Sequence, residues 1–158
     1  MQFDELRFVC QQAAIDSLQT HGRPMPPTVV LPGQERTRLL TLPELPADDE
    51  RRHAVFAQLA ADHLTGDGVP CWGFVAEAEV GGEDAVVVVY GARRHAPHLT
   101  ASRFDTEGAL EEFVPDEELD PTAMPFLHPM QHAVDALPAA GDVFSDADPK
   151  RSGGLPIV

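Results

Sequence analysis

Residues 70–94, PCWGFVAEAEVGGEDAVVVVYGARR, form the one long segment of the chain that is both β-branched and clearly alternating. Two such runs on either side of a Gly-Gly pair predict a β-hairpin that turns at Gly81-Gly82. A two-residue turn there sets Phe74 opposite Val89, whereas a four-residue loop over Gly81 to Asp84 shifts the pairing by two residues. Both leave the same side chains on each face. We therefore expect this hairpin to be the centre of the fold, with the rest of the chain covering it.

The predicted hairpin has one face that is apolar throughout and one that is apolar only in part. The first face carries Trp72, Phe74, Ala76, Ala78, Val80, Val87 and Val89. The second face carries Val75, Val86, Val88 and Tyr90, with Glu77 and Glu79 toward the turn. Because the run 85–90 is apolar on both faces, it belongs inside a sheet and not at a wet edge.

The rest of the chain supplies helices and shorter strands. Apolar residues at helical spacing predict helices over 3–20 and from Asp48 or Asp49 to about residue 64. Short alternating segments predict strands at 28–31, 35–42 and 99–104, with 109–114 as an optional sixth. Residues 129–137 are compatible with one more short helix, and 138–158 have the composition of an extended or partly disordered tail.

This order of elements predicts a single α+β domain over residues 1–137. Its sheet is antiparallel with about five strands, in the order helix, two strands, helix, three strands. We expect both main helices to pack on the face of Trp72 and Phe74. The proline-rich C-terminal segment after Pro115 is expected to be irregular.

The second face of the hairpin needs a cover of its own, because an apolar patch in the middle of a sheet is not left in water. With both helices assigned to the first face, two covers remain. One is the 115–137 segment, whose apolar groups are Phe126, Leu127 and Met130. The other is a second subunit, and we favour this homodimer. The candidate interface residues are then Val75, Val86, Val88 and Tyr90.

Charge limits the class of partner. The chain holds 26 acidic residues against 11 lysines and arginines, a formal net charge of −15. Such a field repels phosphate backbones and anionic lipids, so we expect no nucleic-acid partner and no binding to a membrane surface. A basic protein partner is compatible with it.

Several features indicate a cytoplasmic protein. The segment Met1 to Glu5 is already acidic, and no apolar run approaches the ~18 residues that a membrane span needs.

Cys10 and Cys71 have no metal-binding or redox spacing, and we expect both to be buried as small apolar residues. Abundant Ala, Arg, Pro and Asp with one Lys are typical of a GC-rich bacterial genome.

The chain has seven histidines, and the most suggestive cluster is His95-Ala-Pro-His98, which Asp105 follows. Imidazole and carboxylate groups are ligands that zinc prefers, so these three residues are the candidate metal ligands. His95 and His98 can meet an ion only if the loop that holds them folds back toward Glu77 or Asp105. The sequence thus gives a possible divalent-metal site at this loop.

Two further groups of ionisable residues favour a structural interpretation. His128 and His132 have helical i, i+4 spacing, but Pro129 fits the first helical position and moves His128 to the cap. This pair also lacks the glutamate of an HExxH motif. Glu77 and Glu79 alternate onto the second face of the hairpin, where we expect solvated carboxylates and not an acid–base pair.

No motif in the chain is specific enough to name a reaction, since GxGxxG, GxxxxGK[ST], GxSxG and HExxH are all absent. We therefore expect a small acidic domain that acts by association, as a homodimer or as an adaptor for a basic partner, and not by catalysis. Catalytic residues are unknown, and no cofactor is expected. The alternative is a small metal-dependent hydrolase that binds a divalent metal through His95, His98 and Asp105.

Overall fold

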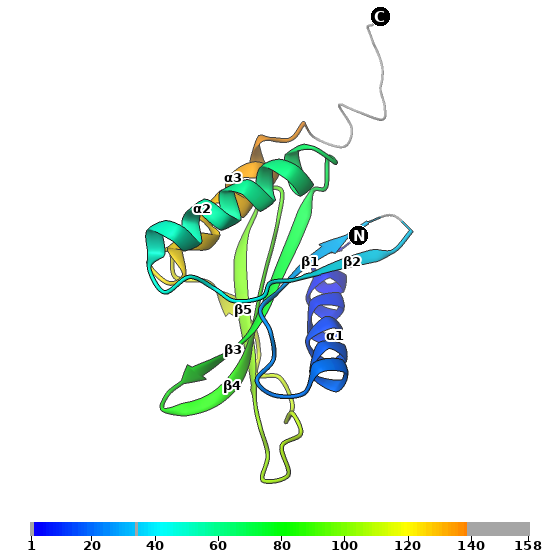
Figure 1. Cartoon of the computed structure of the whole chain (residues 1–158). Helices are drawn as coiled ribbons and strands as arrows, with labels where there is room; N and C mark the ends of the chain where they lie inside the picture. Colours follow the sequence, from blue (N-terminus) through cyan, green and yellow to red (C-terminus); the bar gives the residue numbers. More distant parts are fainter. Residues whose placement is uncertain (1, 34, 139–158) are drawn as a thin grey trace, which may run out of the picture.

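A computed structural model describes residues 2–33 and 35–138 of the chain (Figure 1). The helices are α1 (Phe3–His21), α2 (Asp49–Leu59) and α3 (His128–Ala136), with a π-helical segment η1 (Ala60–Thr65) after α2 and a 3-10 turn η2 (Pro125–Leu127) before α3. The strands are β1 (Thr28–Pro32), β2 (Thr37–Thr41), β3 (Cys71–Val80), β4 (Glu83–Ala92), β5 (His95–Arg103) and β6 (Glu117–Glu118). The predicted tail, from residue 139 onward, lies outside the described residues.

The predicted hairpin is confirmed. Strands β3 and β4 pair over ten residues, with Phe74 opposite Val89. Gly81 and Gly82 form the two-residue turn with φ angles of 61° and 83°. Positive φ at both central positions is the requirement of a type I′ turn, which suits glycine and matches the twist of the flanking strands. The two-residue turn therefore sets both the register and the faces of the hairpin.

All six strands lie in one antiparallel sheet in the order β2-β1-β3-β4-β5-β6, which confirms the α+β class. Strand β4 lies inside the sheet, as the sequence predicts, with β3 beside it, and β2 forms an edge. Strand β5 begins at His95, earlier than the predicted start at 99. The optional strand at 109–114 makes only one isolated bridge, from Leu110 to Phe104, and the sixth strand is the short β6.

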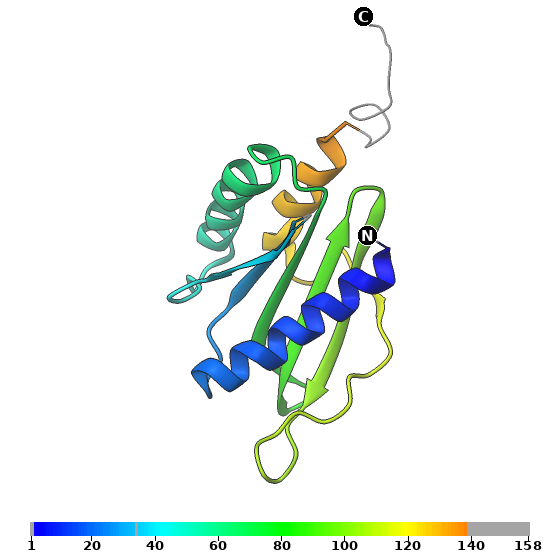
Figure 2. The same ribbon diagram turned by 90° about the vertical axis from the view of Figure 1, so that its right-hand side faces the viewer.

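The predicted placement of both main helices on one face is wrong, because α1 covers the opposite face (Figure 2). The four candidate interface residues lie buried in the cluster that α1 forms with the sheet. These residues are Val75, Val86, Val88 and Tyr90. A cover from the same chain thus replaces the second subunit that we expected on this face.

The size of the residues on α1 explains why it packs there. Its buried residues are Leu6, Cys10, Ala13, Ala14 and Ser17, and all of them except Leu6 have small side chains. Opposite them, β3 has a glycine, Gly73, where a Cβ atom would overlap the Cys10 sulfur and approach the Val30 Cβ to 3.1 Å. The stripe of small residues and the glycine allow a close approach that a larger side chain at either position would prevent.

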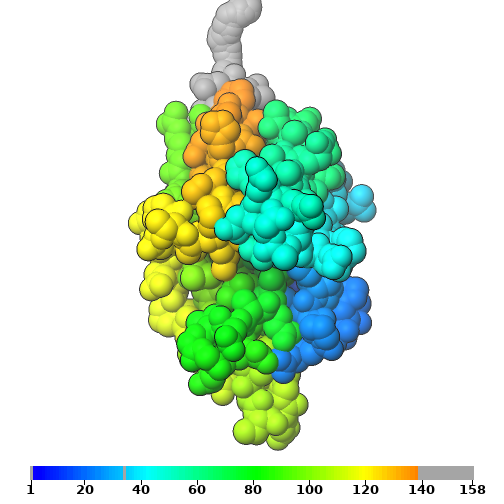
Figure 3. All heavy atoms as spheres, turned by 60° about the vertical axis from the view of Figure 1, so that its left-hand side comes forward, coloured from blue at the N-terminus to red at the C-terminus, as the bar shows by residue number. Residues whose placement is uncertain are grey.

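The face of Trp72 and Phe74 packs against α2, η1, η2 and α3, and Figure 3 shows α2 beside the C-terminal segment. This location corrects the expectation for the proline-rich segment, which does not reach the α1 face. Its apolar residues Phe126, Leu127 and Met130 all belong to the core on the Trp72 side. Helix α3 confirms the expected short helix, one residue earlier than predicted.

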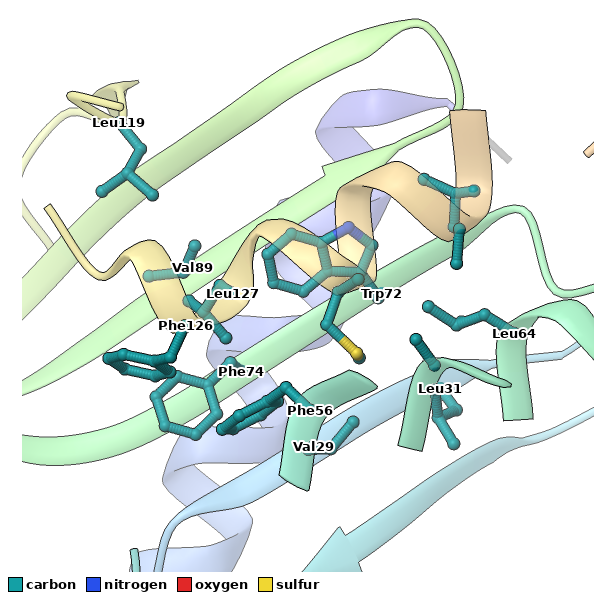
Figure 4. Packing of buried hydrophobic residues seen from close by; sticks show 14 of the residues in the cluster. Val29, Leu31, Phe56, Leu64, Trp72, Phe74, Val89, Leu119, Phe126 and Leu127 are labelled. Atoms are coloured by element: carbon teal, nitrogen blue, oxygen red, sulfur yellow. The ribbon is translucent and has the colours of Figure 1, made fainter. Parts of the chain in front are cut away.

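Aromatic contacts organise this second core (Figure 4). Phe56 of α2 meets Phe74 edge-on at a centroid distance of 5.4 Å, and Phe126 lies 5.4 Å from Phe56 in a tilted arrangement. Edge-to-face and tilted pairs at this spacing are favourable beyond the area they bury. Trp72 donates from Nε1 to Gln131 Oε1 of α3 at 3.1 Å, so its one polar atom is also satisfied.

The two cysteines are free and buried, as the sequence predicts. Cys10 lies on α1 against the sheet, and Cys71 begins β3 on the same side. No helix in residues 2–33 or 35–138 combines the length and apolar character that a bilayer crossing requires.

Replacing Gly73 with alanine tests the placement of α1. The new Cβ would overlap the Cys10 sulfur, so we expect Gly73→Ala to lower the free energy of unfolding by about 1–3 kcal/mol, the usual range for overpacking. Urea denaturation followed by circular dichroism measures this change. In a Cys10→Ala background the same substitution should lose most of its effect, because the overlapping sulfur is gone. Equal losses in both backgrounds would contradict the contact.

Candidate functional site

Residues 105–120, which we name the acidic strap, run along the edge of β5 and include β6. They contain eight acidic residues and no lysine or arginine. Hydrogen bonds fix their backbone to β5, from Glu111 N to Arg103 O at 2.8 Å and from Val114 N to Ala101 O at 2.9 Å. The strap therefore covers most of this edge of the sheet.

Two buried hydroxyl groups of β5 hold the strap in place. Thr100 Oγ1 donates to the Val114 carbonyl at 2.6 Å, and Ser102 Oγ donates to the Glu111 carbonyl at 2.5 Å. Both hydroxyl side chains are 1% exposed, so each bond satisfies a polar group that water cannot reach. Ser102, which lies between the predicted metal ligands in the sequence, thus has a structural role.

An open groove of about 770 Å³ lies between α1 and the first part of the strap. Its walls combine apolar side chains with two glutamines and two glutamates, and no basic residue lines it. The lining residues are Gln11, Ile15, Leu18, Gln19 and residues 108–113. The groove is therefore apolar and anionic at once.

Asp116 joins the strap to α1, β4 and β5. Its Oδ2 accepts a hydrogen bond from the Tyr90 hydroxyl at 2.8 Å and lies 2.8 Å from His98 Nδ1. Its Oδ1 accepts from Arg7 Nη1 at 3.1 Å. The hydrogen bonds from His98 and Tyr90, together with the bond and charge of Arg7, lower the pKa of Asp116 to about 2. Four elements thus meet at one ionised carboxylate.

Tyr90 enters this network as a neutral phenol. Burial raises its pKa, and the hydrogen bond to the Asp116 carboxylate raises the pKa further. A phenol that keeps its proton is a fixed donor and a poor acid–base catalyst at neutral pH. The network is therefore suited to holding the strap against the sheet.

Phe3, at the start of α1, packs among the rings beside Asp116. It stacks on His95 at a centroid distance of 4.7 Å and meets His98 edge-on at 5.1 Å. The Tyr90 ring lies 5.1 Å away in a tilted arrangement. The two histidines of the predicted metal cluster therefore share an apolar neighbour.

The structure does not bring His95, His98 and Asp105 together. Asp105 follows β5, seven residues after His98, which is roughly 23 Å along a strand at ~3.3 Å per residue. Its carboxylate accepts the backbone N–H groups of Glu107 at 2.8 Å and Ala109 at 3.0 Å, and so shapes a turn. In the part of the chain that the structure describes, no three His, Cys, Asp or Glu side chains are placed to hold a metal ion.

Glu77 does not turn toward the histidines and instead binds the connector between α1 and β1. It accepts from Arg23 Nη2 at 2.7 Å and from Met25 N at 3.1 Å. The hydrogen bond from Arg23 is the main cause that lowers the pKa of Glu77. The Arg23 guanidinium also lies over the Phe104 ring, 3.7 Å from its centroid. Glu79 is exposed, as the sequence predicts.

The second histidine pair also stays apart from any cluster of ligands. His128 is the first residue of α3, one position inside the predicted cap, and its Nε2 lies 3.0 Å from the Pro121 carbonyl. His132 is exposed on the same helix. Helix α3 packs on the sheet through Met130, Ala133 and Val134, and neither histidine belongs to that buried side.

Asp116 cannot be singled out from the sequence, because the strap holds seven other carboxylates and nothing local distinguishes it from them. The one usable signal is Tyr90, the polar group beside three valines on the second face of the hairpin. A buried tyrosine hydroxyl needs a hydrogen-bond partner, and the strap is the nearest supply of acceptors.

Comparison with family models, curated proteins and solved structures finds no match to this chain.

The lowered pKa of Asp116 gives a pH-dependent prediction. A depressed carboxyl pKa stabilises the fold above pH ~4, and this contribution is lost as the pH falls toward 2. We expect Asp116→Asn to lower the free energy of unfolding by about 1.5–3 kcal/mol at neutral pH, the range for hydrogen bonds to charged groups. Denaturation at a series of pH values should show this difference shrinking between pH ~4 and pH ~2.

Glu118→Gln is the matched control for this measurement, since it removes an exposed carboxylate of the same strap. It should change stability little at any pH. A loss in Asp116→Asn that stays constant as the pH falls would show that ionised Asp116 does not hold the strap.

Proposed function

We propose that this protein acts by association and binds a basic, partly apolar segment of a partner protein. The proposal is carried by the groove between α1 and the acidic strap, which offers apolar walls and carboxylates and no lysine or arginine. Apolar contacts would supply most of the affinity, and the carboxylates would select cationic partners. An adaptor for a basic partner is the function class that this surface supports best.

The charge of the strap extends beyond the groove. Seven of its eight acidic residues are exposed, the exception being Asp116. Among the described residues, Asp116 is also the only strap carboxylate in an ion pair, which it forms with Arg7. The other seven carboxylates have no ion-pair partner among the described residues, so their negative charge is available to attract a cationic partner. Association should therefore be faster at low salt and weaker as salt rises.

A homodimer is also part of the proposed mode of action, but it must use a surface other than the predicted one. Val86 and Val88, the centre of that predicted face, are fully buried under α1. Two acidic straps would in addition repel each other. The proposed compartment is the cytoplasm, which is supported by the two free cysteines of the core, since thiols persist in a reducing environment.

The metal-dependent hydrolase, the alternative from the sequence, has weaker support. His95 and His98 contact Phe3, and Asp105 shapes a distant turn. Elemental analysis of the purified protein, with thermal shift in zinc, manganese and chelator, tests it directly. Stoichiometric metal and a Tm that falls with chelator would favour the hydrolase over the adaptor.

The adaptor proposal is tested with a fluorescent peptide that alternates lysine or arginine with leucine. We expect it to bind with an affinity that falls as salt rises, while a peptide with glutamates in place of the cations should not bind. Replacing both Glu111 and Glu112 with glutamine should weaken binding by roughly 2–30-fold, from ~0.2–1 kcal/mol for each exposed charge pair. Fluorescence anisotropy measures both effects.

The control variant carries Glu44→Gln and Glu50→Gln, two exposed carboxylates near α2 that do not line the groove. It changes the net charge by the same amount as the groove variant. Binding that falls equally in both variants would reduce the effect to overall charge and overturn the groove. Binding of the acidic peptide would exclude a cationic partner altogether.

A further inference from the structure

The two edges of the sheet differ in whether another segment of the chain covers them. The β5 edge is covered by the acidic strap, whereas nothing in residues 2–33 or 35–138 pairs with the outer edge of β2 (Figure 1). Leu39, in the middle of β2, is 43% exposed. Proteins usually protect an edge strand with charge, proline or a covering segment, because its free backbone groups pair readily with another strand.

The hydrogen-bond pattern shows which backbone groups of β2 are free. Gly33 N donates to Arg36 O at 2.9 Å, and Leu42 N donates to Pro27 O at 2.8 Å. In an antiparallel pair the hydrogen-bonded positions alternate, so the even-numbered residues from 36 to 42 face β1. The N–H and C=O groups of Thr37, Leu39 and Thr41 therefore point away from the sheet.

We propose that β2 pairs with β2 of a second copy of this chain, antiparallel about a twofold axis at Leu39, and joins the two sheets into one. In this register Leu39 faces the same residue of the second copy as a hydrogen-bonded pair. Thr37 faces Thr41 of the second copy, and Thr41 faces Thr37. All three outward positions are then hydrogen-bonded on both chains.

The side chains of β2 are self-complementary in this register. On the α1 side, the two exposed Leu39 side chains bury each other, flanked by pairs of threonines, which are favourable cross-strand neighbours. On the other side, Arg38 faces Leu40 of the second copy, so its aliphatic stem covers an apolar group. No charged residue faces a like charge directly across the pair.

Charge also favours a second copy at this edge. Residues 33–43 contain two arginines and one acidic residue, whereas the acidic strap holds eight acids and no arginine. Arg38 is neutralised within its own chain by Asp67 at 3.0 Å. For a chain with a net charge of −15, the β2 edge is thus a place where two copies can approach with little repulsion. This surface is separate from the groove, and the proposal does not depend on the basic partner.

Sedimentation velocity over a micromolar to millimolar range tests the proposal. The wild type should shift from monomer to dimer as concentration rises. Leu39→Glu places two like charges at the axis and should remain a folded monomer over this range. Leu39→Pro removes the outward N–H without touching the bonds to β1 and should do the same. Circular dichroism confirms that both variants are folded.

Val114→Glu is the matched control, because Val114 is 48% exposed and lies on the strap at the opposite edge of the sheet. It makes the same kind of change as Leu39→Glu and should leave the dimer intact. A dimer that survives both Leu39 variants, or a wild type that is monomeric at millimolar concentration, would overturn the proposal.

Amide hydrogen exchange on the wild type tests the register without any substitution. The amides of Thr37, Leu39 and Thr41 should exchange fast when dilute and slow down as concentration rises. Those of Arg38 and Leu40 bond to β1 and should be protected throughout. Outward amides that exchange equally fast at every concentration would exclude pairing through β2, even if a dimer forms elsewhere.

Discussion

Strand β4 is apolar on both faces, and the rest of the fold depends on this constraint. Val86 and Val88 lie on one side and Val87 and Val89 on the other, and all four are buried. At ~25 cal/mol for each Å² of apolar surface, leaving either side wet would forfeit several kcal/mol. The sheet therefore needs a cover on each face. The chain supplies α1 before the first strand, and α2 and α3 for the other side.

Both faces of the sheet are covered by helices of the same chain, so the two surfaces that we propose for partners are the groove beside α1 and the outer edge of β2. At one edge the strap is fixed by Thr100, Ser102 and Asp116, and it carries most of its carboxylates outward beside an apolar groove. At the other edge β2 ends the sheet with an exposed leucine and with backbone groups that no described residue pairs. We propose the first surface for a cationic segment of a partner and the second for the β2 strand of another copy.

The sequence predicts the features of the fold that depend on neighbouring residues, and it does not predict those that depend on contacts between distant segments. Alternation and the Gly-Gly pair are enough for the two faces of the hairpin and for the central place of β4. The sequence leaves the register open between a two-residue turn and a four-residue loop, and the structure has the two-residue turn. The face that α1 covers depends on a size match between Cys10 and Gly73, which are far apart in the chain, so helical periodicity alone could not assign it. The site is less predictable still, because it depends on which of eight strap carboxylates meets Tyr90.

The assignment of the two helical layers to the two faces can be measured directly by methyl–methyl NOEs in protein labelled at Ala, Val, Leu and Met. We expect contacts from Leu6 and Ala14 of α1 to the even-numbered valines, Val86 and Val88. We also expect contacts from Met130 of α3 to the odd-numbered side of β4. NOEs from α1 to Val87 or Val89 would contradict this arrangement of the helices.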